Sequence, residues 1–197
     1  MNVTIPYTPR KQQAFIHTEL DKHRFSVLCC HRRFGKTVML INHLIKCCMM
    51  NKNHQPRFAY IAPTYSQAKK IAWDYLKFYT KGLPNTKYNE TELRCDFFNG
   101  SRITLLSSEN PDSIRGIYLD GVVCDEASQI SRELIDEVIR PAIADRKGWM
   151  SLCSTPKGMN NIFYDMYLKA QQEKDWFLYK AKASETNLVD KEELDAA

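Results

Sequence analysis

The chain has 197 residues, of which 44% are hydrophobic and 26% are charged, a composition typical of one globular domain with a substantial core. Lysine and arginine total 28 against 23 acidic residues, and the net charge of +5 permits contact with a polyanion without demanding it. No repeat, low-complexity linker or apolar run of membrane-spanning length occurs, which excludes repeat architectures and membrane-spanning proteins.

The cysteines indicate a reducing environment. Their number is odd, none forms a C-x-x-C pair, and no histidine stands at zinc-ligand spacing from them. Most lie in apolar runs, so we expect small buried side chains rather than disulfides or zinc ligands. With no signal-peptide pattern at the N-terminus, we expect a cytosolic protein without a membrane partner. The seven are Cys29, Cys30, Cys47, Cys48, Cys95, Cys124 and Cys153.

The first part of the chain alternates helical and strand-like patterns. Residues 25–30, FSVLCC, form an apolar run without alternation, which predicts a strand buried on both faces. The neighbouring apolar residues predict, in chain order, a short amphipathic helix at 12–23, a helix at 36–50, a second buried strand at 57–63 and a helix at 66–82.

The second part begins with a hairpin. Asn99-Gly100 stands between two strand-like runs within residues 91–108, a strong hairpin signal. Alternation then resumes, with a strand at 121–126, a helix at 131–143, a strand at 149–155, a helix at 159–174, a strand at 176–183 and the beginning of a further helix in 184–197. This order predicts a three-layer αβα fold whose mainly parallel sheet is extended by the antiparallel hairpin.

Residues 29–37, CCHRRFGKT, end like a phosphate-binding loop, although Cys30 stands where the first glycine is expected. A GK[ST] triplet occurs by chance in roughly one chain in ten of this length. Here it lies between a buried strand and an apolar helix, where backbone N–H groups can bind phosphate. Gly35 would allow close approach, Lys36 would reach the β- and γ-phosphates, and Thr37 would ligate Mg²⁺. The alternative is an ordinary loop before a helix.

A second motif, GVVCDE at 121–126, is an apolar strand that ends in two carboxylates. Asp125 would hold the metal at the carboxyl edge of the sheet, and Glu126 would deprotonate an attacking water. Two adjacent acids with separate tasks favour hydrolysis over phosphate transfer to a small molecule. The alternative is that both acids only begin the next helix, where they favour the positive end of its dipole.

Arginine and hydroxyl side chains could complete the site. Arg32 and Arg33 lie inside the loop, and Arg115 precedes the acidic strand, so each could stabilise charge on the γ-phosphate. For Arg33 and Arg115, spacing alone equally fits a solvated surface position. Ser154 and Thr155, in STPKG, could cap the next helix or sense the γ-phosphate from the end of a neighbouring strand.

Together these pieces resemble the ATPase domain of the large terminase subunit, the DNA-packaging motor of tailed bacteriophages. The resemblance rests on order and spacing over nearly the whole chain: YTPRKQQ, HRRFGKT, the hairpin, SIRG, VVCDEAS, CSTPKG and ASETN. It implies a P-loop NTPase fold of the ASCE, RecA-like type. The family commonly tolerates a non-glycine residue at the first loop position and carries an arginine within the loop, so Cys30 and Arg32 fit it.

The resemblance also implies roles for individual residues. It makes Asp125 and Thr37 the holders of Mg²⁺, Glu126 the catalytic base, and Ser154 and Thr155 the motif that couples hydrolysis to movement. The catalytic arginines would be Arg32 and Arg115, the latter as a finger offered to the next subunit of a ring. The implied ATP-binding residues are Tyr7 and Gln12 or Gln13 near adenine, and Arg32, Arg33, Phe34, Gly35, Lys36 and Thr37 in the loop, with no separate role for Arg33.

The implied function is hydrolysis of ATP, with Mg²⁺, to drive double-stranded DNA into a procapsid in the cytoplasm of an infected bacterium. The expected partners are DNA, a portal protein, a small terminase subunit and copies of the same chain, monomeric in isolation and in a ring, expected to be pentameric, on the procapsid. We expect residues 1–182 to form the ATPase core and 183–197 to begin a lid subdomain. The family's nuclease domain is expected to be absent from this chain.

Two other interpretations remain at this point. A superfamily 2 helicase or related translocase shares comparable motifs but requires a second RecA-like domain, for which this chain has no room. A nucleotide-binding scaffold would bind ATP without turnover, and Glu126 argues against it because a binding-only site needs no base.

Overall fold

One eight-stranded sheet organises the part of the chain that the structure describes, residues 4–186 and 188 of a computed structural model. The strand order is β3-β4-β5-β2-β6-β7-β1-β8. The six strands from β5 to β8 pair in parallel, whereas β3-β4 and β4-β5 are antiparallel. The strands are β1 Phe25–Cys30, β2 Arg57–Ala62, β3 Lys87–Asn89, β4 Arg94–Asp96, β5 Arg102–Ser107, β6 Gly121–Asp125, β7 Trp149–Ser154 and β8 Trp176–Ala181.

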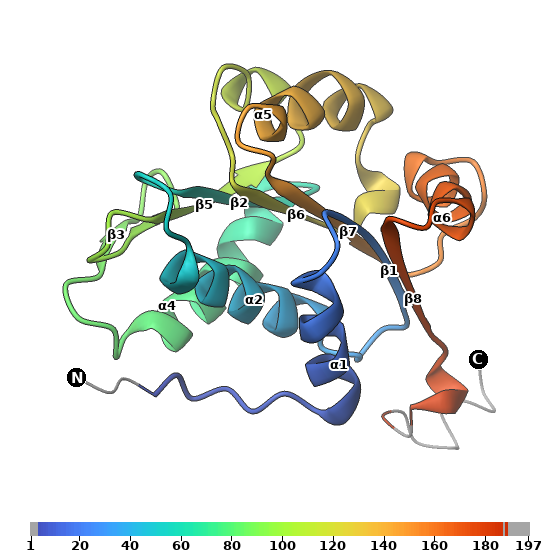
Figure 1. Ribbon diagram of the computed structural model, residues 1–197, viewed down its shortest axis with the longest axis horizontal. Helices are drawn as coiled ribbons and strands as arrows, with labels where there is room; N and C mark the ends of the chain where they lie inside the picture. The colour runs from blue at the N-terminus through green and yellow to red at the C-terminus, as the bar shows by residue number, and fades with distance from the viewer. Residues whose placement is uncertain (1–3, 187, 189–197) are drawn as a thin grey trace.

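Helices cover both faces of this sheet, with α1, α2 and α4 on one side and α5 and α6 on the other (Figure 1). The α-helices are α1 Lys11–Leu20, α2 Lys36–Met50, α3 Tyr65–Gln67, α4 Asp74–Thr80, α5 Arg140–Ala144 and α6 Ile162–Gln172. The π-helices are η1 Ala68–Trp73 and η4 Leu134–Ile139, and the short 3₁₀ segments are η2 Pro111–Ser113, η3 Ala127–Gln129 and η5 Ala183–Glu185. The predicted three-layer αβα architecture, with a mainly parallel sheet extended by antiparallel strands, is confirmed.

The two layers of helices enclose two hydrophobic clusters. One lies beneath α1, α2 and the α3-η1-α4 segment and includes Met39 and Trp73, both almost fully buried. The other lies beneath η4, α5 and α6 and includes Leu134 and Phe163. Because β1, β2, β6 and β7 contribute to both clusters, their apolar runs do not alternate with polar residues. The cysteines follow the same pattern: all are free thiols, and all except the half-buried Cys47 are buried.

The hairpin forms where Asn99-Gly100 predicted it, between β4 and β5. The connection has a wider turn than a two-residue loop, since the Phe97 amide donates to the Ser101 carbonyl at 2.9 Å. Gly100 takes a φ of +80°, and the Asn99 side chain accepts from the Ser101 amide at 3.1 Å. The sequence did not predict β3, whose three residues, Lys87–Asn89, add an outer antiparallel strand.

Three helices differ from their predicted form, and one of them, expected at 131–143, consists of the π-helical η4 followed by the short α5. The helix expected at 66–82 is one helical run whose middle part, η1, has π-helical turns. The helix expected from residue 184 begins as the short η5, and most of its remaining residues lie outside the described part of the chain. None of the helices in residues 4–186 and 188 is long and apolar enough to cross a membrane.

Candidate active site

The loop between β1 and α2 has the backbone of a phosphate-binding loop. Gly35, at the N-cap of α2, has a φ of +79°, and Arg33 is also in the left-handed region at +67°. Lys36 is only 8% exposed, and its Nζ donates to the carbonyls of Cys30 at 3.4 Å and His31 at 3.3 Å. The loop therefore binds the ammonium group through two of its carbonyls, and the N-cap Gly35 has no side chain that could cap the first amides of α2, which suits anion binding.

Helix α1 braces this loop from the side of the first hydrophobic cluster. Gln13 Nε2 donates to the Phe34 carbonyl at 3.2 Å, and Arg10 Nη2 donates to the same oxygen. A Cβ atom at Gly35 would lie 3.0 Å from Arg10 Nη2 and 3.1 Å from Gln13 Nε2. Position 35 therefore requires glycine for its positive φ and also for the space that α1 leaves.

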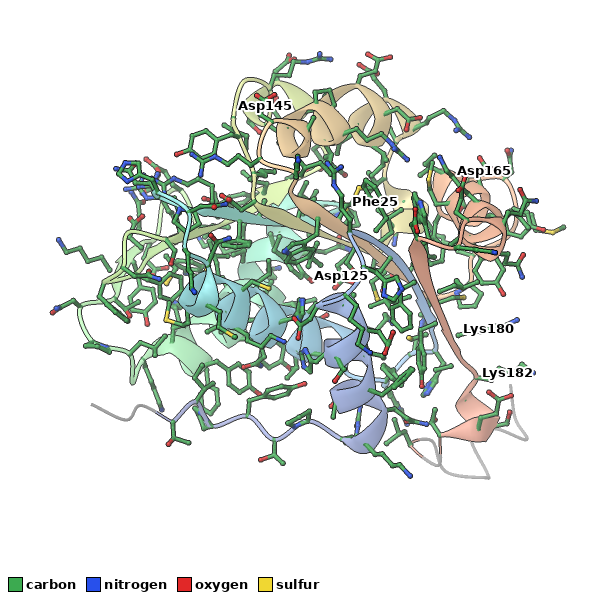
Figure 2. All side chains as sticks on the ribbon, viewed as in Figure 1. Phe25, Asp125, Asp145, Asp165, Lys180 and Lys182 are labelled. Carbon is green, nitrogen blue, oxygen red and sulfur yellow. The ribbon has the colours of Figure 1, made fainter. Side chains whose placement is uncertain are left out.

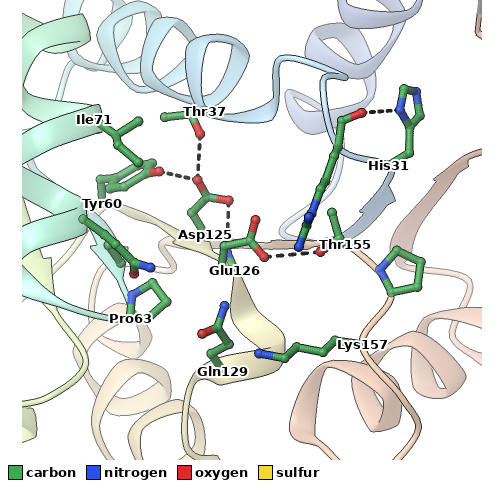
Figure 3. A pocket seen from close by; sticks show the side chains of 14 residues that line it. His31, Thr37, Tyr60, Pro63, Ile71, Asp125, Glu126, Gln129, Thr155 and Lys157 are labelled. Atoms are coloured by element: carbon green, nitrogen blue, oxygen red, sulfur yellow. Dashed lines mark hydrogen bonds between the residues drawn. The ribbon is translucent and has the colours of Figure 1, made fainter. Parts of the chain in front are cut away.

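The acidic strand places a carboxylate opposite the start of α2. Asp125, the last residue of β6, is 6% exposed, and its Oδ2 accepts from Thr37 Oγ1 at 2.9 Å and also from the Tyr60 hydroxyl (Figure 3). Its Oδ1 accepts from the Glu126 amide at 3.0 Å. Burial, reinforced by the nearby Asp125 charge, raises the pKa of Tyr60 well above its ordinary value, so the phenol remains a hydrogen-bond donor.

Glu126 connects the acidic strand to the end of β7. Its φ of +48° and ψ of +44° are left-handed, which is uncommon for a residue with a side chain. Its Oε2 lies 3.4 Å from Ser154 Oγ and 3.5 Å from Thr155 Oγ1, and Ser154 Oγ lies 2.8 Å from Ser128 Oγ. The carboxylate therefore lies within reach of the hydroxyl groups of the STPKG motif, although the single Ser154 proton cannot serve Ser128 and Glu126 at once.

These contacts argue against one alternative in each of two pairs left by the sequence. Helix α6 is capped by Asn161, whose side chain accepts from the Tyr164 amide at 3.0 Å, so the capping role considered for Ser154 and Thr155 is wrong. Asp125 ends a strand and is followed by the left-handed Glu126 and the short η3, so these acids do not simply begin a long helix.

The loop, the acidic strand and the end of β7 surround one pocket of about 670 Å³. It lies at the carboxyl edge of the parallel strands, where β6 ends in Asp125 and where Lys180 stands near the end of β8 (Figure 2). Ile71 of η1, Gln129 of η3 and Lys157 of the loop after β7 also line it (Figure 3). The lining residues are His31, Arg32, Thr37, Tyr60, Ala62, Pro63, Gln67, Ile71, Asp125, Glu126, Gln129, Thr155, Pro156 and Lys157.

A comparison with protein families assigns the chain. A family model described as the N-terminal part of the terminase large subunit, T4likevirus-type, matches residues 31–196. The chain belongs to this family. The match does not favour the helicase interpretation.

Curated relatives support this assignment. The terminase chain is 29% identical over 181 residues to the large terminase subunit of Thermus phage G20c, covering 82% of this chain and 36% of that protein. It is also 29% identical over 167 residues to that of Escherichia phage T5, covering 81% of this chain and 37% of the relative. The chain thus spans little more than a third of the curated relatives it matches.

Solved structures resemble the terminase domain as well. The large terminase ATPase domain of Thermus phage P74-26 is 25% identical, with a TM-score of 0.74 over 90% of this chain and 82% of that one. The large terminase of a thermophilic bacteriophage, solved in complex with ADP, has a TM-score of 0.76 at 18% identity over 94% of this chain and 48% of that one. The Hef helicase domain of Pyrococcus furiosus, at 11% identity and a TM-score of 0.59, shares the fold alone.

The terminase site brings together only some of the residues predicted for it. Arg32, Thr37, Asp125, Glu126 and Thr155 line the pocket, while Lys36 and Ser154 do not line it but contact the lining residues His31 and Glu126. Within the described residues, the lining does not include Tyr7, Gln12, Gln13, Arg33, Phe34 or Arg115.

The residues outside the lining have other surroundings. The Tyr7 hydroxyl lies 3.0 Å from His17 Nε2, and the Phe34 side chain is buried in the core. Arg115 is exposed, and its guanidinium pairs with Asp112 at 3.0 Å and Glu133 at 3.4 Å. Contact of these residues with ATP, or of Arg115 with a neighbouring subunit, remains a prediction.

Several residues of the site were not singled out from the sequence. Tyr60, Gln67 and Ile71 come from β2 and the helical segment after it. Gln129 follows the VVCDEAS motif, and Lys157 lies inside STPKG but was given no role there. The predicted strand at 57–63 contained a usable signal, because the carboxyl ends of parallel strands meet at one edge of the sheet.

Proposed function

We propose that this chain is the ATP-hydrolysing domain of a large terminase subunit and that it drives double-stranded DNA into a procapsid. The observation that carries the proposal is the convergence of Lys36, Thr37, Asp125 and Glu126 on one pocket at the carboxyl edge of the sheet. The ATPase domain named for the P74-26 relative, and the ADP complex of the thermophilic bacteriophage enzyme, support a nucleotide as the ligand.

The residues at the start of α2 fit Mg²⁺. The Thr37 hydroxyl and the Asp125 carboxylate lie 2.9 Å apart and offer oxygen ligands, which this hard cation prefers. Thr37 would hold the ion directly, and Asp125 directly or through water. When bound, Mg²⁺ would neutralise charge on the β- and γ-phosphate oxygens.

The protein's own groups supply the remaining chemistry. Lys36 can exchange the carbonyls of Cys30 and His31 for phosphate oxygens, and the first amides of α2 bind the same anion. Glu126 accepts a proton from the attacking water, with Ser154 and Thr155 beside its carboxylate. Arg32, which lines the pocket, stabilises the charge that spreads over the γ-phosphate oxygens.

The proposed assembly is a ring in which Arg115 serves the pocket of the next subunit. Arg115 is exposed and lies outside the lining of its own pocket, which suits a group that acts across a head-to-tail interface. We further propose DNA, a portal protein and a small terminase subunit as partners, and the cytoplasm of an infected bacterium as the location. The isolated domain would be monomeric and a slow ATPase.

The Glu126→Gln variant tests the base. It keeps the shape of the side chain but cannot accept the proton, so hydrolysis should fall by about 10²–10⁴-fold while ATP still binds. Phosphate release and binding of a fluorescent ATP analogue would be measured side by side, with Glu173→Gln, an exposed change after α6, as the control. Equal hydrolysis by Glu126→Gln and the wild type would show that Glu126 is not the base. A scaffold that only binds nucleotide would show no turnover in any of these proteins.

A further inference from the structure

Tyr60 is a buried polar residue of the pocket that the proposed chemistry leaves without a role. It lies near the carboxyl end of β2, whose neighbour in the sheet is β6, and is paired in register with Val123. The residue is 3% exposed, and its hydroxyl donates to Asp125 Oδ2 (Figure 3).

The ring of Tyr60 cannot easily leave this position. It belongs to the hydrophobic cluster beneath α1, α2 and the α3-η1-α4 segment, so its body is packed while its hydroxyl reaches the pocket wall. A phenol has few rotatable bonds, and its length carries the hydroxyl from the sheet to the carboxylate. The hydroxyl is thus a fixed donor delivered by a rigid strand.

Asp125 receives donors from three parts of the chain. Thr37 belongs to α2, Tyr60 to β2, and the Glu126 amide follows β6 itself. Two of these donors meet on Oδ2 and the third meets Oδ1, so rotation of the carboxylate about its Cβ–Cγ bond would break at least one of them. Without Tyr60, only Thr37 of α2 and the adjacent Glu126 amide would hold the carboxylate.

We propose that Tyr60 is a positioning residue for Mg²⁺, and that its hydroxyl holds the Asp125 carboxylate in the orientation that binds the ion beside Thr37. The inference rests on the proposed function, since it assumes that nucleotide and Mg²⁺ bind in this pocket. Hydrogen-bond partners that orient metal-binding groups are commonly needed for full metal affinity. Tyr60 would act on the metal only through Asp125.

Calorimetric titration of ADP, once with Mg²⁺ and once with EDTA, measures this role directly. The ratio of the two dissociation constants is the gain in affinity that Mg²⁺ provides. In Tyr60→Phe, which removes only the hydroxyl, this gain should fall by about tenfold, while the affinity for ADP in EDTA stays unchanged. Tyr60→Met provides a second hydroxyl-free side chain that adapts to a buried space, and it should lose the same gain.

Tyr88→Phe is the matched control. Its hydroxyl is also partly buried and lies 2.9 Å from Thr80 Oγ1, but it comes from β3, away from the pocket. This variant should keep the full Mg²⁺-dependent gain. A structural role for Tyr60 would lower the melting temperature without changing the ratio of dissociation constants.

The possible outcomes separate this inference from the proposed function. If the wild type binds ADP more tightly with Mg²⁺ and both Tyr60 variants retain that gain, the positioning role is wrong while the proposed function stands. The positioning role is also overturned if both variants fail to fold while Tyr88→Phe folds, because Tyr60 would then be a structural residue. Absence of ADP binding by the wild type would overturn the proposed function itself.

Discussion

Replacing Gly35 with alanine should destabilise the domain and weaken nucleotide binding together. The φ of +79° costs an alanine about 1–2 kcal/mol. The new Cβ would also lie 3.0 Å from Arg10 Nη2 and 3.1 Å from Gln13 Nε2, so both side-chain ends must shift by a few tenths of an ångström. We expect this shift to weaken their bonds to the Phe34 carbonyl, at a cost of about 1 kcal/mol more. The unfolding free energy should therefore fall by about 2–3 kcal/mol, which lowers the melting temperature by about 5–10 °C in a domain of this size.

Gly100→Ala is the control that separates backbone strain from crowding. Gly100 has nearly the same φ, +80°, but a Cβ there would have no neighbour within 4 Å. Thermal unfolding should show a loss of about 1–2 kcal/mol for this variant, without an effect on ADP binding. An equal loss of stability in the two variants would refute the argument that α1 crowds the loop. No loss in either variant would refute the argument that a positive φ strains an alanine at these positions.

Three further predictions concern the base, pH and assembly. Thr155→Val removes the hydroxyl 3.5 Å from Glu126 Oε2, so phosphate release should slow while ADP titration shows unchanged binding; an unchanged rate would contradict the contact. Burial lowers the pKa of His17 to about 4, from 6.5, and that of His43 below its ordinary value. Between pH 4 and 6.5 the unfolded chain therefore binds more protons than the folded one. Urea midpoints should therefore fall as the pH drops from 6.5 towards 4, and a midpoint independent of pH would contradict this. Arg115→Ala should slow hydrolysis only at concentrations where subunits assemble, and an equal loss in dilute protein would argue against action across an interface.

The fold could be read largely from the sequence because its main signals are local. The apolar runs at 25–30, 57–63, 121–126 and 149–155 contain few polar interruptions, and only a strand buried on both faces accounts for such runs between helical segments. The order of strands and helices then limits the topology to a covered parallel sheet. The three-residue β3 carries no such pattern, since its pairing with β4 depends on the rest of the sheet.

Site residues that belong to a short sequence motif could be predicted, whereas those that reach the site only through contacts with distant parts of the chain could not. Thr37 and Asp125 belong to recognisable motifs, and the structure joins them at 2.9 Å. Tyr60 gave no signal of its own, because a tyrosine in a buried strand is ordinary until the neighbouring strand places a carboxylate beside its hydroxyl. The sequence likewise could not predict the partner of Thr155, since a hydroxyl after a strand can cap the next helix. Only the structure, in which Asn161 caps α6, excludes this capping role.

The left-handed backbone of Glu126 places stability and activity in opposition at a single residue. Glycine adopts such a conformation without penalty, whereas for glutamate it costs about 1–2 kcal/mol. A substitution to glycine would relax the turn between β6 and η3, yet it would remove the carboxylate that lies beside Ser154 and Thr155. Selection for a more stable domain alone would thus favour replacement of this glutamate, and the proposed role as base is what would oppose that replacement.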